Sequence, residues 1–322
     1  MTVEELKDKV KSVFNKAHSA QVYLVLKQKA DLVIKPADLE DETTAPEVKK
    51  LFEQFVINLV VTNQELQICN LSVADERVNA IYLYDYESYP EELGLFKNFD
   101  ITHAVKIDKF NFNIDDLSSL YGYIIYLGSM QDGVVLFKKH YPISLIKRDS
   151  FLLGAIKAKE RFELISGDDI LRLNGTAQLL RVGDDIFVLD VKTLERNMGF
   201  TALIEKAAQE SVEAIEKLEI LEDIEVLKDT LEEISFSRRL SKVKKTSPIF
   251  GLNISTEAIV DFTKNTPVLA GKFKYNEDGT KIRLDTKKSK EAFLKLMNDA
   301  FLHSELTEQY YEASAKDNIT AS

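Results

Sequence analysis

The 322-residue sequence has no tryptophan, and proline, glycine, cysteine and histidine are scarce. Six prolines and twelve glycines argue against long disordered linkers. Without tryptophan, the aromatic part of the core must come from 18 Phe and 12 Tyr. The single cysteine, Cys69, excludes an internal disulfide, and there is no CxxC or Cys/His cluster to bind zinc. We therefore expect a cytoplasmic protein with no metal and no cofactor.

Long hydrophobic runs are also missing. The longest, FVINLVV at 55–61, is far shorter than the roughly 18 residues that a membrane span needs. Residues 1–17 predict an amphipathic helix capped by Thr2, and their recurring charges differ from the apolar core of a signal peptide. The composition, 45% hydrophobic and 30% charged, is ordinary for a soluble globular protein. We expect the chain to reach a membrane only through a partner.

The hydrophobic periodicity of the first 200 residues predicts an α+β fold with a largely antiparallel sheet. Strands are indicated where apolar and polar residues alternate, and turns where Asp-Gly or Asn-Gly stands between two such runs. The expected elements are strands at 21–27 and 79–89, helices at 47–60 and directly after Pro90, a hairpin at 121–140 around Asp132-Gly133, and further strands within 169–200 with turns at Asn174-Gly175 and Gly183-Asp184.

At Thr201, a candidate N-cap, the pattern changes to helical spacing. Residues 201–234 predict two helices with a break near 219–222, and residues 254–265 predict another helix capped by Ser255. A hairpin at 269–286 around Asp278-Gly279 and a helix at 287–302 complete this part. We therefore predict an N-terminal α+β domain (1–200) and a mainly helical C-terminal domain (201–322) that contains the hairpin.

The charges in the C-terminal part are sharply segregated. Residues 201–234 hold eleven acidic and three basic residues, a net charge of −8. Residues 235–290 hold thirteen basic and five acidic residues, a net charge of +8, in a chain whose total is −11. The basic part begins with SFSRRLSKVKKTS at 235–247, which has five positive charges and no negative one. Such segregation usually has a reason.

One interpretation is a site for the phosphate backbone of duplex DNA. A basic helix beside a basic hairpin grips a backbone by releasing counterions, and it does so largely without sequence preference. The candidate DNA-binding residues are Arg238, Arg239, Lys242, Lys244, Lys245, Lys281, Arg283, Lys287 and Lys288. The alternative is that the acidic and basic segments pair with each other, within one chain or between subunits, as in an oligomeric adaptor that binds no DNA.

A second alternative is a metal-dependent nuclease. In DDIFVLDVK at 184–192, Asp184 or Asp185 precedes Asp190, and Lys192 follows two residues later, so that Asp190 and Lys192 would share a strand face. Turn chemistry explains the paired aspartates equally well. No GxSxG, GxxxxGK[ST], GxGxxG or HExxH motif is present, and the four histidines are scattered. We expect a protein that is not an enzyme.

Tyr82, Tyr84 and Tyr86 alternate along the predicted strand at 79–89 and would lie on one face of it. Such a face is typical of base stacking in single-strand binders, or of packing against another element. The acidic residues around it would repel phosphate, which favours packing.

The stretch at 151–200, FLLGAIKAKERFELISGDDILRLNGTAQLLRVGDDIFVLDVKTLERNMGF, contains a short strand ending at Leu173, a strand-turn-strand with DDIFVLD, a Lys-x-x-Glu start and a closing GF. With the helical segment that follows, it resembles the KwaB family, the soluble component of the two-gene Kiwa anti-phage defence system, over nearly the full length. The resemblance implies a homo-oligomer that binds DNA and associates with a small membrane-spanning partner, KwaA, at the inner membrane. There it would block phage replication or transcription. The resemblance assigns no individual DNA contact.

Overall fold

The structure is a computed structural model that describes residues 1–17, 19–29, 31–39, 42–74, 77–86, 88–141, 145–146, 152–156, 161–165, 170–171 and 173–313. It confirms the predicted fold class. A mostly antiparallel sheet lies in the N-terminal half, and helices with a β-hairpin form the C-terminal half. Much of the stretch from 142 to 172, where the quoted KwaB-like segment begins, lies outside the described residues.

The chain forms two compact units. Unit 1 comprises Met1–Cys69, Asn79–Tyr84 and Glu91–Leu194, and unit 2 comprises Asn70–Val78, Asp85–Pro90 and Glu195–Ser322. Two short segments from the N-terminal half therefore belong to the C-terminal unit. A division into independently folding domains at residue 200 stays a prediction.

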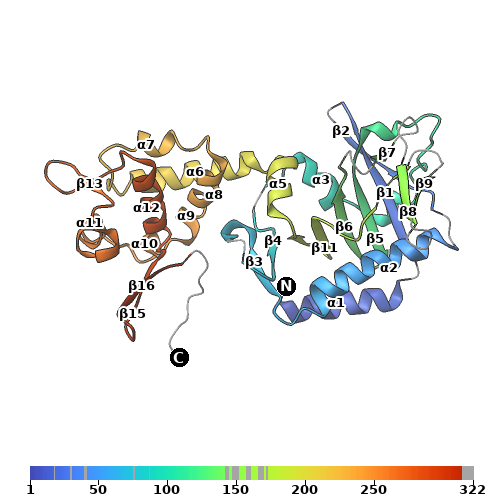
Figure 1. The fold of residues 1–322 in the computed structure, drawn as a ribbon, viewed down its shortest axis with the longest axis horizontal. Coiled ribbons are helices and arrows are strands. Elements are labelled where there is room, and N and C mark those ends of the chain that lie inside the picture. The colour runs from blue at the N-terminus through green and yellow to red at the C-terminus, as the bar shows by residue number, and fades with distance from the viewer. Residues whose placement is uncertain are drawn as a thin grey trace. The chain divides into compact units, whose positions relative to one another are not determined.

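An eight-stranded sheet dominates unit 1, in the order β2-β1-β5-β6-β11-β12-β4-β3 (Figure 1). The β5–β6 hairpin lies at the predicted position, and Gly183 allows the β11–β12 turn because its φ is +63°. The strands are β1 (Ser19–Gln28), β2 (Asp31–Pro36), β3 (Gln67–Asn70), β4 (Ala80–Leu83), β5 (Leu120–Gly128), β6 (Gly133–Lys139), β11 (Leu179–Val182) and β12 (Asp185–Val188).

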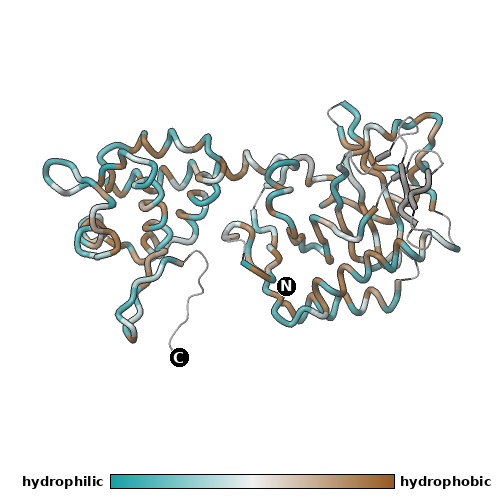
Figure 2. The backbone as a smooth tube through the Cα atoms, in the orientation of Figure 1, coloured by the Kyte–Doolittle hydropathy of each residue, from teal (hydrophilic) through white to brown (hydrophobic). Residues whose placement is uncertain are grey.

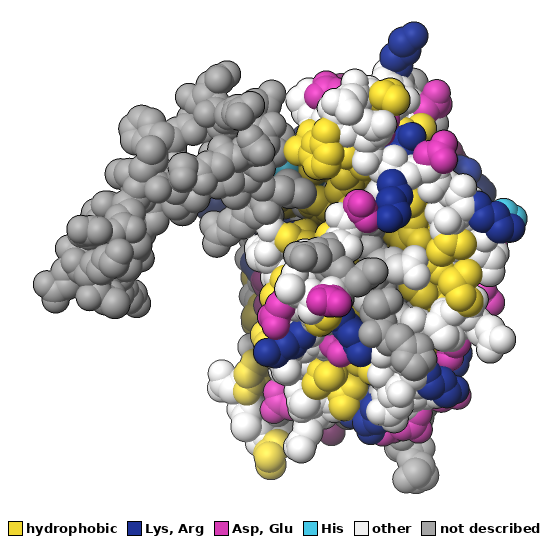
Figure 3. Space-filling model, turned by 90° about the vertical axis from the view of Figure 1, so that its right-hand side faces the viewer, with side chains coloured by type: hydrophobic (Ala, Val, Ile, Leu, Met, Phe, Trp, Pro, Cys, Tyr) yellow, Lys and Arg dark blue, Asp and Glu magenta, His cyan; other side chains and the backbone are white. Residues whose placement is uncertain are grey.

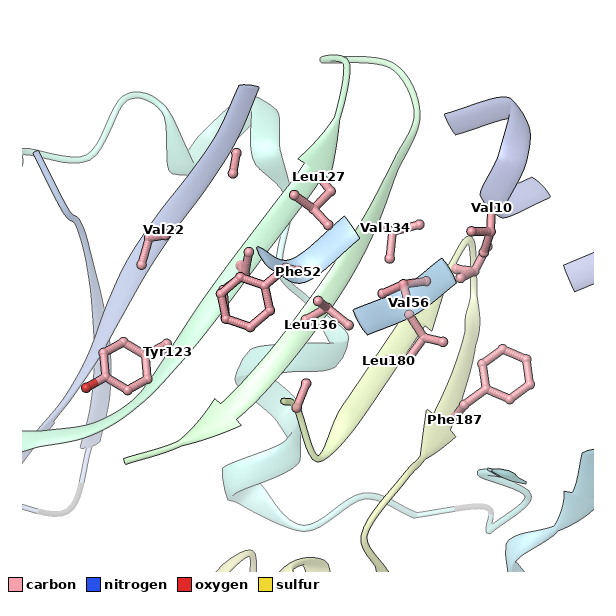
Figure 4. Close-up of a cluster of buried hydrophobic side chains, with 14 of the residues drawn as sticks. Val10, Val22, Phe52, Val56, Tyr123, Leu127, Val134, Leu136, Leu180 and Phe187 are labelled. Atoms are coloured by element: carbon pink, nitrogen blue, oxygen red, sulfur yellow. The ribbon is translucent and has the colours of Figure 1, made fainter. Parts of the chain in front are cut away.

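Helices α1 (Val3–Lys16) and α2 (Thr44–Val56) cover one face of this sheet. Thr2 caps α1 as predicted, in a capping box with Glu5. A π-helical turn, Ile57–Val61, continues α2. Figure 4 shows Phe52 and Val56 of α2 among side chains of the sheet, including Leu136 and Leu180, and all four are fully buried. In Figure 2 the central strands are mainly hydrophobic, as strands covered on both faces must be.

The opposite face of the sheet carries α3 (Glu91–Lys97) and α4 (Ile101–Ala104). The Phe96 ring packs on Phe137 of β6 with ring centroids 6.1 Å apart. The Arg181 guanidinium donates to the carbonyl oxygens of Lys97 and Phe99, which fixes the end of α3 on the sheet. Two further strand pairs are β7 (Leu145–Ile146) with β10 (Ile170–Leu171) and β8 (Leu152–Ile156) with β9 (Arg161–Ile165).

Unit 2 is mainly helical around its own hydrophobic core. The predicted break near 219–222 is confirmed, and Ser255 caps α11 as predicted. Phe200, rather than Thr201, is the N-cap of α6, because the Thr201 hydroxyl donates to the Glu195 carbonyl instead. The elements are α6 (Thr201–Glu216), α7 (Glu225–Lys228), α8 (Ile234–Leu240), α9 (Val243–Thr246), α10 (Pro248–Gly251), α11 (Thr256–Asn265), β13 (Lys274–Tyr275), β14 (Ile282–Arg283), α12 (Lys287–Met297), β15 (Phe301–Ser304) and β16 (Gln309–Glu312).

Two further sequence predictions, both of element ends, need correction. The helix expected at 287–302 ends at Met297, because residues 301–312 form an additional antiparallel hairpin, β15–β16. The strand expected at 79–89 ends at Leu83. Within the part of the chain that the structure describes, no helix is both long enough and apolar enough to span a membrane.

Candidate nucleic-acid interface

The segment 235–247 forms α8 and α9, and both helices lie on the core of unit 2. Phe236, Leu240 and Val243 recur at helical spacing and are buried. This burial fixes the directions of the neighbouring cations. The nine predicted DNA-binding residues therefore differ in exposure and in what they contact.

Arg238 and Lys242 are half-buried and serve the packing of unit 2. The Arg238 guanidinium forms an ion pair with Glu195, whose side chain is only 4% exposed. Lys242 Nζ donates to the carbonyl oxygen of Ala74. Both contacts join the basic segment to residues far away in the sequence.

Lys245 makes a third contact to residues that are distant in the sequence. Its Nζ lies 2.7 Å from Asp85 Oδ2 and 3.0 Å from Ser72 Oγ. The Asp85 carboxylate also accepts from the Ser72 backbone N–H at 2.8 Å, and its side chain is 14% exposed. Next to it, burial followed by the charge of Asp85 raises the pKa of Tyr86 to about 12. Asp85 is therefore a nearly buried carboxylate with one exposed cationic partner.

Lys244 and Arg239 lie nearer the solvent. Lys244 Nζ forms a 3.0 Å ion pair with Glu210 of α6, and both side chains are about half exposed. Arg239 is half-buried, and its Nε donates to the Ser235 carbonyl at 3.3 Å. Glu210 belongs to the acidic segment, so this pair joins the two oppositely charged segments.

The β13–β14 hairpin confirms the predicted hairpin, and it attaches to the end of the acidic segment. Ile282 of β14 bonds to Ile220 and Glu222 through the backbone. Arg283 Nε lies 2.6 Å from Glu222 Oε2, and its side chain is 55% exposed. Lys281 is half-buried. Lys274, which is not among the nine predicted residues, pairs with Asp285 at 2.6 Å and lowers the pKa of that carboxyl.

Lys287 and Lys288 occupy the first two positions of α12. The first turn of this helix has no acidic residue, although the helix dipole favours anions and disfavours cations there. Lys287 Nζ lies 3.3 Å from Glu233 Oε1, and hydrogen bonds from Ser235 and then Lys287 lower the pKa of Glu233. Lys288 is exposed, and it has no carboxylate partner among the residues that the structure describes.

Among the residues that the structure describes, ion pairs are seen for five of the nine predicted cations, and three of the partners, Glu210, Glu222 and Glu233, come from the acidic segment. Asp85 and Glu195 could not be recognised from the sequence as partners of these cations, because a carboxylate that is distant in the chain and buried gives no local charge signal. Assignment of DNA contacts to the nine cations stays a prediction.

The residues of the nuclease alternative are not arranged as predicted. β12 ends at Val188, and Lys192 lies in α5 (Val191–Asn197), so Asp190 and Lys192 do not share a strand face. The Asp190 carboxylate instead accepts from the Thr193 backbone N–H at 3.0 Å and the Thr193 hydroxyl at 2.7 Å, as a helix cap does. Asp184 is exposed in the β11–β12 turn, and Asp185 Oδ2 lies 3.7 Å from the N-terminal amine. Among the described residues, no cluster of three or more His, Cys, Asp or Glu side chains is arranged to hold a metal.

The tyrosines of the 82–86 stretch are packing residues. Tyr82 and Tyr84 are 5% and 7% exposed, and the Tyr86 ring meets Phe200 edge-on with centroids 5.1 Å apart. Stacking of bases on Tyr82 and Tyr84 is excluded because their rings are covered.

The fold and its charges define an α+β protein with a charge-segregated helical unit, and comparison with known proteins identifies its family. The family model described as Kiwa protein KwaB-like matches residues 117–307. The chain belongs to this family, which confirms the resemblance. The Kiwa protein KwaB of Escherichia coli O55:H7 (strain RM12579 / EPEC) is 28% identical over 327 residues, which cover 99% of each chain. No solved structure matches.

Proposed function

We propose that this chain acts in anti-phage defence by holding duplex DNA through backbone phosphates, as a self-associating protein that docks on a membrane-spanning partner. Membership of the KwaB-like family supports the defence role. The DNA contact is proposed for four exposed cations, Lys244, Arg283, Lys287 and Lys288, referred to below as the outer cations.

The observation that carries the DNA proposal is the exposure of these side chains together with that of their partners. Lys244, Arg283 and Lys287 are 53%, 55% and 72% exposed, and Glu210, Glu222 and Glu233 are 46%, 34% and 49% exposed. Exposed ion pairs contribute roughly 0–1 kcal/mol, so a phosphate can replace the carboxylate at little cost. Lys288, at the start of α12, has no carboxylate partner among the described residues, so a phosphate would not have to replace one there.

Arg238, Lys242 and Lys245 have a different role in this proposal. Their contacts hold residues of the segments at 70–78, 85–90 and 195 within unit 2. A variant that removes them would lose DNA binding through loss of structure, so it cannot test the DNA contact. The outer cations can be changed without exposing a buried carboxylate.

The test is a fluorescence-anisotropy titration of a labelled duplex with the full chain and with a variant in which Lys244, Arg283, Lys287 and Lys288 are replaced by Gln. A matched control replaces four other exposed lysines, Lys11, Lys16, Lys206 and Lys217, by Gln and changes the net charge equally. We expect only the outer-cation variant to lose binding. Equal losses in both variants would show a general charge effect and reject the site.

The salt dependence gives an independent measure. Neutralising about four phosphates predicts a slope of about −3.6 in a plot of log K against log salt concentration. The slope should be the same for duplexes of unrelated sequence, because lysine and arginine contacts to phosphates carry no base readout. A slope near zero, or strong dependence on sequence, would contradict backbone binding.

The observed pairs also favour a second candidate, an adaptor that binds no DNA. Because Glu210, Glu222 and Glu233 already pair with basic residues, the segregated charges are partly balanced within unit 2. Sedimentation at two salt concentrations, with and without duplex, separates the two functions. DNA binding predicts a faster-sedimenting complex at low salt when duplex is added, whereas the adaptor predicts no effect of duplex at either salt concentration.

A further inference from the structure

A loop in unit 1 exposes two bulky apolar side chains. Between α4 and β5, Phe112 is 82% exposed and Ile114 is 81% exposed. Single exposed apolar residues are common, but an aromatic and a branched side chain two residues apart at this exposure indicate an interaction surface. Figure 3 shows one face of unit 1 on which hydrophobic side chains gather among charged ones.

Hydrogen bonds close the loop locally, and a ring contact packs Phe112 on the core. The Asp115 carboxylate accepts from the Asn111 backbone N–H at 2.9 Å, and the Ile114 and Asp115 N–H groups donate to the Asn111 carbonyl at 3.0 and 2.8 Å. Phe110 is buried in the main core of unit 1, and its ring meets that of Phe112 edge-on at 5.0 Å. A preorganised aromatic side chain loses little conformational freedom on binding, which is typical of interface anchors.

The same unit carries a groove of suitable chemistry along α2. Val48, Leu51 and Phe55 are the apolar residues of this helix that line the groove, and Val48 and Phe55 also pack, partly buried, against the core that contains Phe52 and Val56. Together with Leu173 and Gly175 they line a groove of about 880 Å³. Gly175 approaches Leu51 so closely that a Cβ would lie 2.8 Å from Leu51 Cδ1, so the groove wall depends on glycine. Its volume is within the range of protein binding pockets.

The loop and the groove also match in polarity. Asn111 and Asn113 flank the two exposed side chains, and the groove rim holds four uncharged polar residues, Thr43, Thr44, Gln54 and Asn58. Glu47 and Lys50 add one charge of each sign to the rim. Apolar anchors with few charges are typical of the centre of protein–protein interfaces, whereas nucleic acids and anionic membranes select basic surfaces.

We propose that Phe112 and Ile114 of one copy insert into the α2 groove of a second copy of this chain. The contact joins two different surfaces, so successive copies add head to tail and form rings or open chains. This inference rests on the self-association in the proposed function and names the surface that produces it. The complementary knob and groove on one unit favour a second copy over another partner.

The test uses the full chain in sedimentation-velocity experiments at several protein concentrations. A knob variant, Phe112→Asp with Ile114→Asp, and a groove variant, Leu51→Glu, should each sediment as monomers, with circular dichroism spectra and melting curves like wild type. A control variant, Leu252→Asp with Leu306→Asp, changes side chains that are 72% and 92% exposed and should assemble normally.

Mixing the two monomeric variants gives the decisive outcome. The groove variant retains its knob and the knob variant retains its groove, so the mixture should form a single 1:1 dimer that does not extend. A mixture that stays monomeric would overturn the head-to-tail contact. Normal assembly of either variant would reject this surface but would leave the proposed self-association intact. A monomeric wild type would reject both this surface and the proposed self-association.

Discussion

Neutralising the three carboxylates that pair with the outer cations should strengthen DNA binding. The perturbation is the triple variant Glu210→Gln, Glu222→Gln and Glu233→Gln. These carboxylates lie 3.0, 2.6 and 3.3 Å from Lys244, Arg283 and Lys287. A phosphate that takes the opposite side of each cation lies about 6 Å from the carboxylate and is repelled by it.

The magnitude follows from this distance. Two unit charges about 6 Å apart in water interact by about RT, and screening over a Debye length of about 8–10 Å reduces the interaction to about half. Each carboxylate then weakens binding by a factor of about 1.6, and three together by about fourfold. The triple variant should therefore bind duplex about fourfold more tightly at moderate salt, and the gain should shrink as salt is added.

Anisotropy titrations of the triple variant against wild type measure this gain. A control with the same change in net charge replaces Glu257, Asp261 and Glu305, exposed carboxylates of unit 2 that have no cationic partner among the described residues, by their amides. An equal gain in the control would show that only net charge matters. Unchanged affinity in the triple variant would refute phosphate contacts at Lys244, Arg283 and Lys287, because a phosphate bound at these cations would be repelled by the neighbouring carboxylates.

Three further predictions concern stability and are measured by urea denaturation of the full chain. Arg238→Ala should lower the free energy of unfolding by about 3 kcal/mol, because it leaves the Glu195 carboxylate buried without its cation. Lys244→Ala should change the free energy of unfolding by less than about 0.5 kcal/mol, and similar losses in the two variants would contradict the distinction between Arg238 and the outer cations. Phe52→Ala should lower the free energy of unfolding by about 3–5 kcal/mol, since Phe52 is fully buried between α2 and the sheet. A loss below about 1 kcal/mol would contradict the burial of Phe52 in this core. Burial, followed by the charge of Lys139, lowers the pKa of His140 below 6.5, so the contribution of His140 to stability is present above pH 6.5 and is lost as the pH falls below it. His140→Gln should flatten the dependence of the free energy of unfolding on pH between about pH 7.5 and 5.5, and an unchanged pH dependence would contradict the burial of His140.

Local patterns predicted the parts of the fold that local forces determine. Thr2 and Ser255 cap their helices, and the β5–β6 hairpin closes at the predicted Asp132-Gly133, where Asp132 ends the turn at 129–132 and Gly133 begins β6, because capping and turn chemistry act within a few residues. The β15–β16 hairpin was missed because its strands bury little, so they carry no alternating hydrophobic pattern. Tyr84 and Tyr86 alternate like a strand, although β4 ends at Leu83, because burial by distant residues overrides the local pattern.

The candidate site shows the same limit in its electrostatics. Counting charges selected nine cations together, but charge alone does not distinguish a lysine that binds a ligand from one that neutralises a buried acid. The exposure of the partner makes that distinction. Glu195 and Asp85 are 4% and 14% exposed, so Arg238 and Lys245 are needed to keep a desolvated carboxylate inside unit 2.

Glu210 and Glu233 are 46% and 49% exposed, so water already solvates them and their lysines are exchangeable. Both buried acids precede residue 200, so the basic segment completes unit 2 by binding residues from the earlier part of the chain. An isolated fragment 201–322 would lack Asp85 and Glu195 and would leave Lys245 and Arg238 artificially free. DNA binding measured on that fragment would therefore overstate the basic surface, and only the intact chain gives a valid test of the outer cations.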